Sequence, residues 1–309
     1  MALDRPLLIV NPRSGGGLSE SRWARLAGAV AEGLGPFDTQ MTERPDHAQE
    51  LAREAALAGR HLVVAVGGDG TLNEVVNGLM AAGAPRTTEV ALLPRGTGGD
   101  FRRTLDLPHD FTKAGRRIAQ SQAKPVDVGL VKYVDHSGQP ASRYFVNVSS
   151  FGFSASVASK ANASSKKLGA RSAFLGATVR TVFGYSNLDV QVSIDDAAPL
   201  RRTVLLGAIG NGRFFGGGMK ICPDAVLDSG SLQFVVVGDL GLGAIATKIH
   251  RLYDGTHLKI DRVDGRQIRC VSVAPAEGQA AAPVEVDGET PGTLPATWEV
   301  IPAALMLRA

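Results

Sequence analysis

The residues of this chain that are best suited to chemistry stand in one glycine-rich turn, Gly67-Gly68-Asp69-Gly70-Thr71. An apolar run at residues 61–66 predicts a buried strand before the turn, and the apolar positions of residues 72–79 predict one face of a helix after it. At such a strand-to-helix turn, backbone N–H groups and the helix dipole favour negative charge, and glycines let a phosphate chain approach the backbone. Asp69 adds a carboxylate that could hold Mg²⁺ or accept a proton.

Two further glycine-rich turns have the same context. Residues 7–10 predict a short strand that runs into Asn11 and Gly15-Gly16-Gly17, and residues 90–93 predict a strand that runs into residues 94–101. Ligands of open α/β sheets bind at the carboxyl ends of the strands, so we expect the three turns to converge on one cleft. The phosphate cradle would then be formed by the backbone of residues 15–17, 68–70 and 96–98.

Two well-known nucleotide-binding patterns are absent from the sequence, and their absence narrows the class of anion-binding site. The Walker pattern G-x-x-x-x-G-K-[S/T] is absent, and no G-x-G-x-x-G follows the first predicted strand with an acidic residue placed for a ribose. These absences argue against a P-loop NTPase and a dinucleotide dehydrogenase. Tight-turn geometry explains a single glycine turn, and Thr71 with Glu74 has the spacing of a helix capping box. Three such turns after three apolar strands favour a nucleotide- or phosphate-binding site.

The central turn, continued by Asn73-Glu74-Val75, resembles the hallmark of the diacylglycerol kinase catalytic family, which includes sphingosine and ceramide kinases and soluble bacterial lipid kinases. The turn alone is less specific, because NAD kinases and phosphofructokinases carry close variants. Other segments resemble further landmarks of the family, in family order from residue 8 to residue 289: Asn11-Pro12 with the first glycine turn, residues 94–101, Phe145-Val146-Asn147 with Gly152-Phe153, Gly216-Gly217-Gly218 with residues 223–225 and 230–232, and Val286-Asp287-Gly288-Glu289.

The resemblance implies a kinase that uses ATP and Mg²⁺ and transfers the γ-phosphoryl group to a hydroxyl of a lipid such as diacylglycerol. Asp69 and Asp100 are our candidates for Mg²⁺, which takes one or two carboxylates and keeps several waters. Glu289 matches the proposed proton acceptor of the family, and Asp69 is its rival for that role. The implied nucleotide site consists of Asn11, Gly15, Gly16, Gly17, Thr42, Gly67, Gly68, Asp69, Gly70, Thr71, Leu72, Asn73, Glu74, Gly96, Thr97 and Gly98.

Two positions depart from the family pattern. Gly99 stands where the family usually has Asn, which removes a polar side chain from the third turn. Ser229 stands where a structural Mg²⁺ would expect a carboxylate, so an accessory metal site at Asp228 would need a shifted backbone. Two arginines of the turns, Arg13 and Arg95, could contact phosphate or face solvent. Residues 287–289 also have a structural explanation, because Asp-Gly is a strong hairpin-turn signal.

The composition is that of a globular protein with an ample core, since 44% of the 309 residues are hydrophobic and 20% are charged. The 33 basic and 30 acidic residues give a formal net charge of +3, which does not indicate a nucleic-acid partner. Cys222 and Cys270 lack metal-ligand spacing, and the start of the chain does not resemble a signal peptide, so we expect a reducing, cytoplasmic location. No stretch of about 18 apolar residues predicts a membrane span.

The length is typical of about two domains. Residues 7–122 alternate predicted strands and helices, including a strand near residues 38–42 and a helix that Pro45 opens. This alternation predicts an α/β domain with a parallel sheet and helices on both faces, and the resemblance implies a domain like those of NAD kinases and diacylglycerol kinases. We place this nucleotide-binding domain at residues 1–124, and by resemblance to the family residues 297–309 return to it.

Beyond Lys124 the pattern changes to strands in series, which predicts an all-β antiparallel sandwich. We place this second domain, which would bind the lipid substrate, at residues 125–296. Its predicted strands are residues 126–134, 143–148, 188–194, 202–209, 232–237, 258–263, 267–273 and 284–286, and another strand is predicted in the tail at residues 297–301.

One stretch is unusually basic. Between Asp135 and Asp189 there is no acidic residue, whereas six basic residues occur, and residues 174–183 have the apolar spacing of a helix. A solvated face on an ordinary packed helix explains this pattern. A membrane-facing surface explains it too, because each Lys or Arg near anionic lipid contributes about 1 kcal/mol. The six basic residues are Arg143, Lys160, Lys166, Lys167, Arg171 and Arg180.

We expect a lipid substrate at a membrane surface, with peripheral association of the protein, and the sequence leaves room for a homodimer. One alternative is a soluble-substrate kinase of the NAD-kinase type. Another is a catalytically silent nucleotide-binding module associated with a membrane. The sequence does not name the lipid, because diacylglycerol, monoacylglycerol, phosphatidylglycerol and a sphingoid base all offer a hydroxyl near an interface.

Overall fold

A computed structural model describes residues 5–83, 86–96, 99–163, 186–240 and 247–309 of the chain. The chain divides into two compact units. Unit 1 comprises Met1–Val126 and Ala303–Ala309, and unit 2 comprises Asp127–Pro302. The boundary that we expect near Lys124 lies at the beginning of a strand, β5 (Lys124–Asp135), which starts in unit 1 and continues into unit 2.

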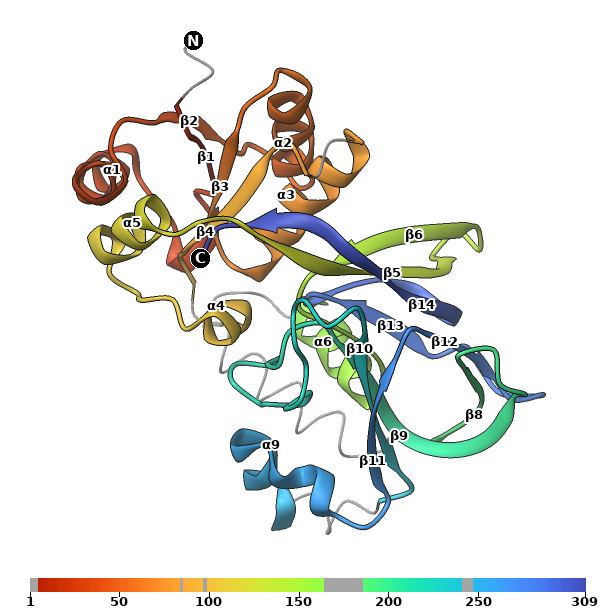
Figure 1. The fold of residues 1–309 in the computed structure, drawn as a ribbon. Helices are drawn as coiled ribbons and strands as arrows, with labels where there is room; N and C mark the ends of the chain where they lie inside the picture. Colours follow the sequence, from red (N-terminus) through yellow and green to blue (C-terminus); the bar gives the residue numbers. More distant parts are fainter. Residues whose placement is uncertain (1–4, 84–85, 97–98, 164–185, 241–246) are drawn as a thin grey trace. The chain divides into compact units, whose positions relative to one another are not determined.

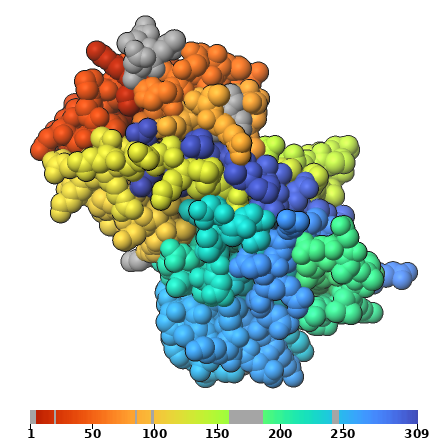
Figure 2. Space-filling model, in the orientation of Figure 1, coloured from red at the N-terminus to blue at the C-terminus, as the bar shows by residue number. Residues whose placement is uncertain are grey.

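Unit 1 is built on a sheet whose strands run parallel (Figure 1). Its central strand β3 pairs with β1 and β4 in the registers Leu8↔Val64 and Val64↔Ala91. Residue Leu307, near the end of the chain, pairs with Val90 of β4. In the space-filling view the last residues of the chain therefore appear among those of the first 126 (Figure 2). The strands are β1 (Leu7–Val10), β2 (Asp38–Met41), β3 (Leu62–Gly67), β4 (Glu89–Pro94) and the end of β14 (Glu289–Leu307), in the order β14-β4-β3-β1-β2.

Helices cover both faces of this sheet, α1 (Glu20–Leu34) and α5 (Phe111–Gln120) on one side and α2 (His47–Leu57) and α3 (Asp69–Ala81) on the other (Figure 1). All residues of β1 and β3 are buried, as expected for strands covered on two sides. The helix predicted to open at Pro45 begins instead at His47, after Asp46 with a φ of 60°. Pro45 therefore belongs to the preceding turn. The remaining short helices of unit 1 are η1 (Ser14–Gly16) and α4 (Asp100–Leu105).

Unit 2 is rich in antiparallel strands, which confirms that part of the prediction. The pairings link six strands in the closed series β7-β9-β8-β12-β14-β13-β7, so each of these strands has two partners within the set. The strands of unit 2 are β5, β6 (Pro140–Phe145), β7 (Val148–Gly152), β8 (Leu188–Ile194), β9 (Leu200–Gly210), β10 (Leu232–Gly238), β11 (Val263–Ile268), β12 (Cys270–Pro275), β13 (Pro283–Val286) and most of β14. Among the described residues of unit 2, the helices are α6 (Phe153–Ala163), α9 (His250–Asp254) and η3 (Thr256–Lys259).

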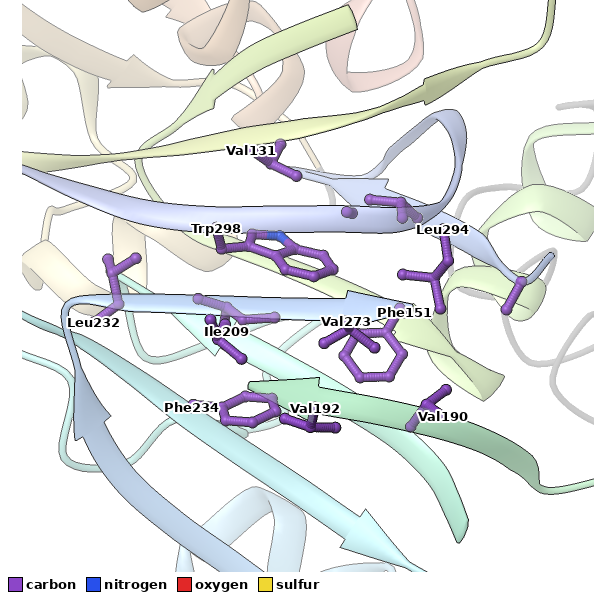
Figure 3. Packing of buried hydrophobic residues seen from close by; sticks show 14 of the residues in the cluster. Val131, Phe151, Val190, Val192, Ile209, Leu232, Phe234, Val273, Leu294 and Trp298 are labelled. Carbon is purple, nitrogen blue, oxygen red and sulfur yellow. The ribbon is translucent and has the colours of Figure 1, made fainter. Parts of the chain in front are cut away.

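The core of unit 2 is centred on Trp298, whose ring lies 5.6 Å from that of Phe151 (Figure 3). Both side chains are fully buried among Val, Ile and Leu residues of the surrounding strands. The indole N–H of Trp298 donates to Ser149 Oγ at 2.8 Å, so the polar atom of this large side chain is satisfied in the interior.

Three strands of unit 2 differ from prediction. Of the predicted strand at residues 258–263, only Val263 lies in a strand, as the first residue of β11. The carboxylate of Asp254 accepts hydrogen bonds from the backbone and hydroxyl of Thr256, and η3 follows instead. The predicted strand at residues 143–148 is divided between β6 and β7, and that at residues 267–273 between β11 and β12. The helical pattern at residues 174–183 lies outside the residues that the structure describes.

Candidate functional site

The first glycine turn follows β1 and is tied to the second turn by Asn11. The side-chain amide of Asn11 donates to Thr71 Oγ1 at 3.0 Å. Its carbonyl oxygen accepts from the backbone N–H of Arg13 at 2.9 Å, and its backbone oxygen accepts from the Ser14 hydroxyl at 2.8 Å. Asn11 therefore shapes its own turn while holding it against the start of α3.

The first turn is tied to the third by Arg95, which follows β4. The guanidinium of Arg95 donates through Nη1 to the backbone oxygen and hydroxyl of Ser14, and through Nη2 to the backbone oxygen of Gly17 at 2.6 Å. Only 7% of the residue is exposed, and this burial lowers the pKa of the guanidinium. Of the two roles left open by the sequence, exposure to solvent is thus wrong for Arg95, whereas Arg13 is exposed.

The second turn is tied to the third by Asp69. Its two carboxylate oxygens accept from the backbone N–H groups of Asp100 at 2.9 Å and Phe101 at 3.1 Å, the first two residues of α4. Burial raises the pKa of Asp69, and the two N–H donors oppose this effect. The backbone N–H of Arg95 also donates to the Gly67 oxygen, at 2.7 Å.

These contacts bring the three turns together at the carboxyl ends of β1, β3 and β4, as the sequence predicts. Each pair of turns is joined directly, by Asn11, Arg95 or Asp69. The N-cap of α3 is Gly68, which has no side chain that could cap the first N–H groups of the helix. Uncapped N–H groups at a helix N-terminus favour an anion, so the arrangement can bind phosphate.

Several other residues of the predicted nucleotide site are buried in unit 1. Leu72 and Asn73 are 1% exposed, and Thr42 is buried where β2 ends. The predicted capping box is wrong, because α3 begins at Asp69 and the Glu74 carboxylate instead accepts from the backbone N–H of Ala48 in α2, at 3.1 Å. Residues 97–98, which include the predicted contacts Thr97 and Gly98, lie outside the described residues.

The acidic groups proposed for Mg²⁺ have different surroundings. Asp69 and Asp100 are neighbours, and the Asp100 carboxylate also pairs with Arg103 at 3.1 Å. Asp228 is exposed, and the hydroxyl of neighbouring Ser229 donates to backbone oxygens of Val226 and Ser231. Across the described ranges, no group of three or more His, Cys, Asp or Glu side chains is placed to hold a metal ion. Asp69 and Asp100 thus fit an ion that arrives with phosphate oxygens, and do not form a dedicated metal cage.

In unit 2 the Asp-Gly-Glu segment forms the turn between β13 and β14. Asp287 is buried, and its carboxylate accepts from the backbone N–H groups of residues 146–148, each at 3.1 Å. The buried Glu285 accepts from the backbone N–H of Gly288 at 2.5 Å and from the Ser150 hydroxyl at 2.6 Å. Glu289 is exposed at the start of β14. The turn is therefore fixed from two sides, while the candidate base remains accessible.

Sequence reasoning missed these supporting roles. The sequence leaves the role of Arg95 open, and it predicts neither the contact of Glu74 with α2 nor the support of the final turn by Asp287 and Glu285. None of these contacts has a local signal, because the Asp-Gly pair predicts the turn itself, whereas the N–H groups that Asp287 binds are 139 to 141 positions away in the chain.

Comparison with known proteins shows which family the chain belongs to. The model of the diacylglycerol kinase catalytic domain matches residues 5–131, and that of the YegS C-terminal NAD kinase beta sandwich-like domain matches residues 147–309. The "Probable lipid kinase YegS-like" of Chromohalobacter salexigens is 30% identical over 299 residues, which cover 97% of this chain and 89% of that protein. The chain belongs to the diacylglycerol kinase family. It is therefore a kinase, and the family implies that it uses a nucleotide.

Other relatives support the same membership. The "Diacylglycerol kinase" of Staphylococcus carnosus is 28% identical over 294 residues, which cover 95% of this chain and 91% of that protein. A solved structure from Bacillus anthracis str. Sterne is 26% identical, with a TM-score of 0.76 and coverage of 99% of this chain and 97% of the other. In the parts of this kinase that the structure describes, no helix is both long and apolar enough to cross a membrane.

Proposed function

We propose that this member of the diacylglycerol kinase family transfers the γ-phosphoryl group of ATP to a hydroxyl of a lipid such as diacylglycerol. The observation that carries the proposal is the joining of three glycine turns at the carboxyl edge of one sheet. Phosphoryl transfer needs cradled phosphates and an oriented hydroxyl, and little covalent work from the protein. The relatives' names, lipid kinase and diacylglycerol kinase, support a lipid as acceptor.

In this proposal the phosphates of ATP lie against the backbone of the three turns and the N-terminus of α3. Asp69 and Asp100 would hold Mg²⁺ together with phosphate oxygens, and the ion would offset the charge of the phosphates. Because Asp69 also holds α4 against the second turn, it fixes the distance between two parts of the cradle. The ionised form of such a buried carboxylate is favoured by a nearby cation.

We assign the proton transfer to Glu289. A bond forms between the lipid hydroxyl oxygen and the γ-phosphorus, the bond from that phosphorus to the β–γ bridging oxygen breaks, and ADP leaves with the electron pair. The hydroxyl proton passes to the carboxylate of Glu289. Glu289 suits this role better than Asp69, because Glu289 is exposed whereas both oxygens of Asp69 already accept backbone N–H groups.

The lipid acceptor leads us to propose peripheral association with a membrane surface. The support is the basic stretch between Asp135 and Asp189 in the sequence, since clustered cations near anionic lipid favour binding. Its central part lies outside the described residues, so the proposal depends on composition.

The test is a panel of acceptors with labelled Mg·ATP. Separate vesicles would contain diacylglycerol, monoacylglycerol, phosphatidylglycerol or a sphingoid base, NAD would be the soluble acceptor, and mass spectrometry would identify the product. We expect one phosphorylated lipid and ADP in equal amounts. Phosphorylation of NAD alone would overturn the proposal in favour of the NAD-kinase type. Binding of ATP without ADP release on any acceptor would indicate a catalytically silent module.

A further inference from the structure

The first glycine turn has few means of holding its own shape. Gly15, Gly16 and Gly17 follow one another at positive φ values of 55°, 83° and 95°. No residue of η1 is buried, so apolar packing does not fix this segment. Successive glycines give the unfolded and open forms of a turn high conformational entropy. A turn that binds phosphate through its backbone needs some external support if it is to be ordered before the ligand arrives.

Arg95 provides such support from another strand. Its guanidinium contacts Ser14 through one nitrogen and Gly17 through the other, so a single side chain holds both ends of η1. Its own backbone is fixed by the hydrogen bond to the Gly67 oxygen, which links the support to the second turn as well. Gly15 lies against the same side chain, since a Cβ on Gly15 would be 3.3 Å from Arg95 Cγ.

The partners of Arg95 are all uncharged. They are backbone oxygens and one hydroxyl, and within the described ranges no acidic side chain forms an ion pair with this buried guanidinium. A buried charge normally has an opposite charge nearby, because its desolvation is costly. Here a full positive charge lies directly behind a turn that is suited to phosphate.

We propose that Arg95 is a positioning residue that holds the first turn in its nucleotide-binding shape and places a cation behind it. The inference rests on the proposed nucleotide site and adds a residue whose side chain does not itself have to touch the nucleotide. The fork of the guanidinium is essential to this role, because a lysine ammonium is a point charge that cannot hold Ser14 and Gly17 at once in the same geometry.

The variants that test the proposal are Arg95→Lys, which keeps the charge, and Arg95→Met, which removes it. Arg22→Met is the matched control, because Arg22 is exposed and its charge acts on Arg95, but no hydrogen bond from its side chain to the first turn is observed. Hydrogen exchange of the nucleotide-free protein, calorimetric binding of Mg·ADP, and the KM values for ATP and lipid would be measured for each variant.

We expect both Arg95 variants to exchange the hydrogen-bonded amides of Ser14 and Gly17 at least tenfold faster. Both should also bind Mg·ADP about 10- to 100-fold more weakly, as the loss of about two hydrogen bonds implies. The KM for ATP should rise while the KM for lipid stays within twofold, a pattern that general destabilisation would not produce. Arg22→Met should change each quantity less than threefold. Exchange in β3 serves as the measure that the variants remain folded.

If Arg95→Lys bound Mg·ADP as tightly as the wild type, the proposed positioning role of Arg95 would be overturned, since the positive charge alone would then suffice. Unchanged exchange at residues 14–17 in both variants would overturn it too. A wild-type protein that binds no nucleotide would instead refute the proposed function, and the exchange comparison would still decide whether Arg95 holds the turn.

Discussion

Replacement of Asp69 should loosen the third glycine turn as well as stop the reaction. The carboxylate of Asp69 accepts two backbone hydrogen bonds from the start of α4, at 2.9 and 3.1 Å. Asn has the same shape but only one acceptor oxygen, so Asp69→Asn can keep one of these bonds and directs its amide hydrogens toward the other donor. Asp69→Ala loses both bonds.

The size of the effect follows from these contacts. A hydrogen bond to a charged group contributes about 1.5–3 kcal/mol, and relief of the buried charge offsets part of this loss. We therefore expect Asp69→Asn to destabilise the contact by about 1–2 kcal/mol and Asp69→Ala by about 2–4 kcal/mol. With 1.4 kcal/mol for each factor of ten, the amides of Asp100 and Phe101 should exchange roughly 10-fold faster in the Asn variant and roughly 30- to 1,000-fold faster in the Ala variant.

Hydrogen exchange without nucleotide measures these amides directly. Asp106→Asn is the matched control, because Asp106 is exposed at the end of α4 and no hydrogen bond of its carboxylate is observed. We expect its effect to be within about 0.5 kcal/mol. If the amides of Asp100 and Phe101 exchange at wild-type rates in Asp69→Ala, Asp69 does not hold α4 in solution and the structural argument is refuted.

Turnover separates the two roles of Asp69. If it also holds Mg²⁺, Asp69→Asn should lower kcat by at least about 100-fold, the scale of loss for a group that stabilises the transition state. A purely structural role would instead raise the KM for ATP and leave kcat nearly unchanged. Near-full activity of Asp69→Asn at saturating ATP would remove Asp69 from the mechanism.

Three further outcomes test other parts of the molecule. Glu289→Gln should lower kcat by about 100- to 10,000-fold with ATP affinity within twofold, whereas a collapse of affinity would make Glu289 a nucleotide or metal ligand. Gly78→Ala should destabilise the fold by at least about 2 kcal/mol in denaturant titrations, because its Cβ would lie 2.2 Å from the backbone oxygen of Gln49. As the control, Gly28→Ala on the exposed face of α1 should stabilise the fold by about 0.5–1 kcal/mol. Burial lowers the pKa of His257, so at this site the folded protein binds fewer protons than the unfolded chain and stability should fall as the pH drops below about 6.5. His257→Gln should reduce this slope in unfolding curves between about pH 5 and 7, where His109 contributes a slope of the same sign, and an unchanged slope would contradict the assignment.

The strands that position the candidate site could be predicted because their sequences are continuous apolar runs. The strands β1 and β3 are buried along their whole length, so every residue in them is apolar or small. The first polar or glycine residues of the following turn then mark where each strand ends. Since a glycine-rich turn follows each run, the position of the three turns at one edge of the sheet follows from topology. Sequence reasoning failed at residues 258–262, where a short stretch of mixed apolar and charged residues, too short to distinguish strand from helix, follows the turn set by Asp254.

The partners of polar side chains could not be predicted in the same way. Thr71 and Glu74 have the spacing of a capping box, yet Thr71 accepts from Asn11 and Glu74 from the backbone of Ala48. Local spacing specifies which contacts are geometrically allowed within one helix. The partner of Thr71 is 60 positions away in the chain, and that of Glu74 is 26 positions away. The buried position of Arg95 escaped prediction for the same reason, because its acceptors are backbone atoms that carry no sequence signal.

Two glycine-flanked acids of this chain, Asp69 and Asp287, use their carboxylates in the same way. Each lies at a turn and accepts backbone N–H groups from a segment that is distant in sequence, α4 for Asp69 and residues 146–148 for Asp287. Proton transfer to such a carboxylate would neutralise the acceptor and weaken the contacts that hold the turn. Glu289 follows the turn braced by Asp287 and is exposed, so it can gain and lose a proton in each cycle without such a cost. This difference is a physical reason to propose that Glu289, and neither of the two aspartates, accepts the proton.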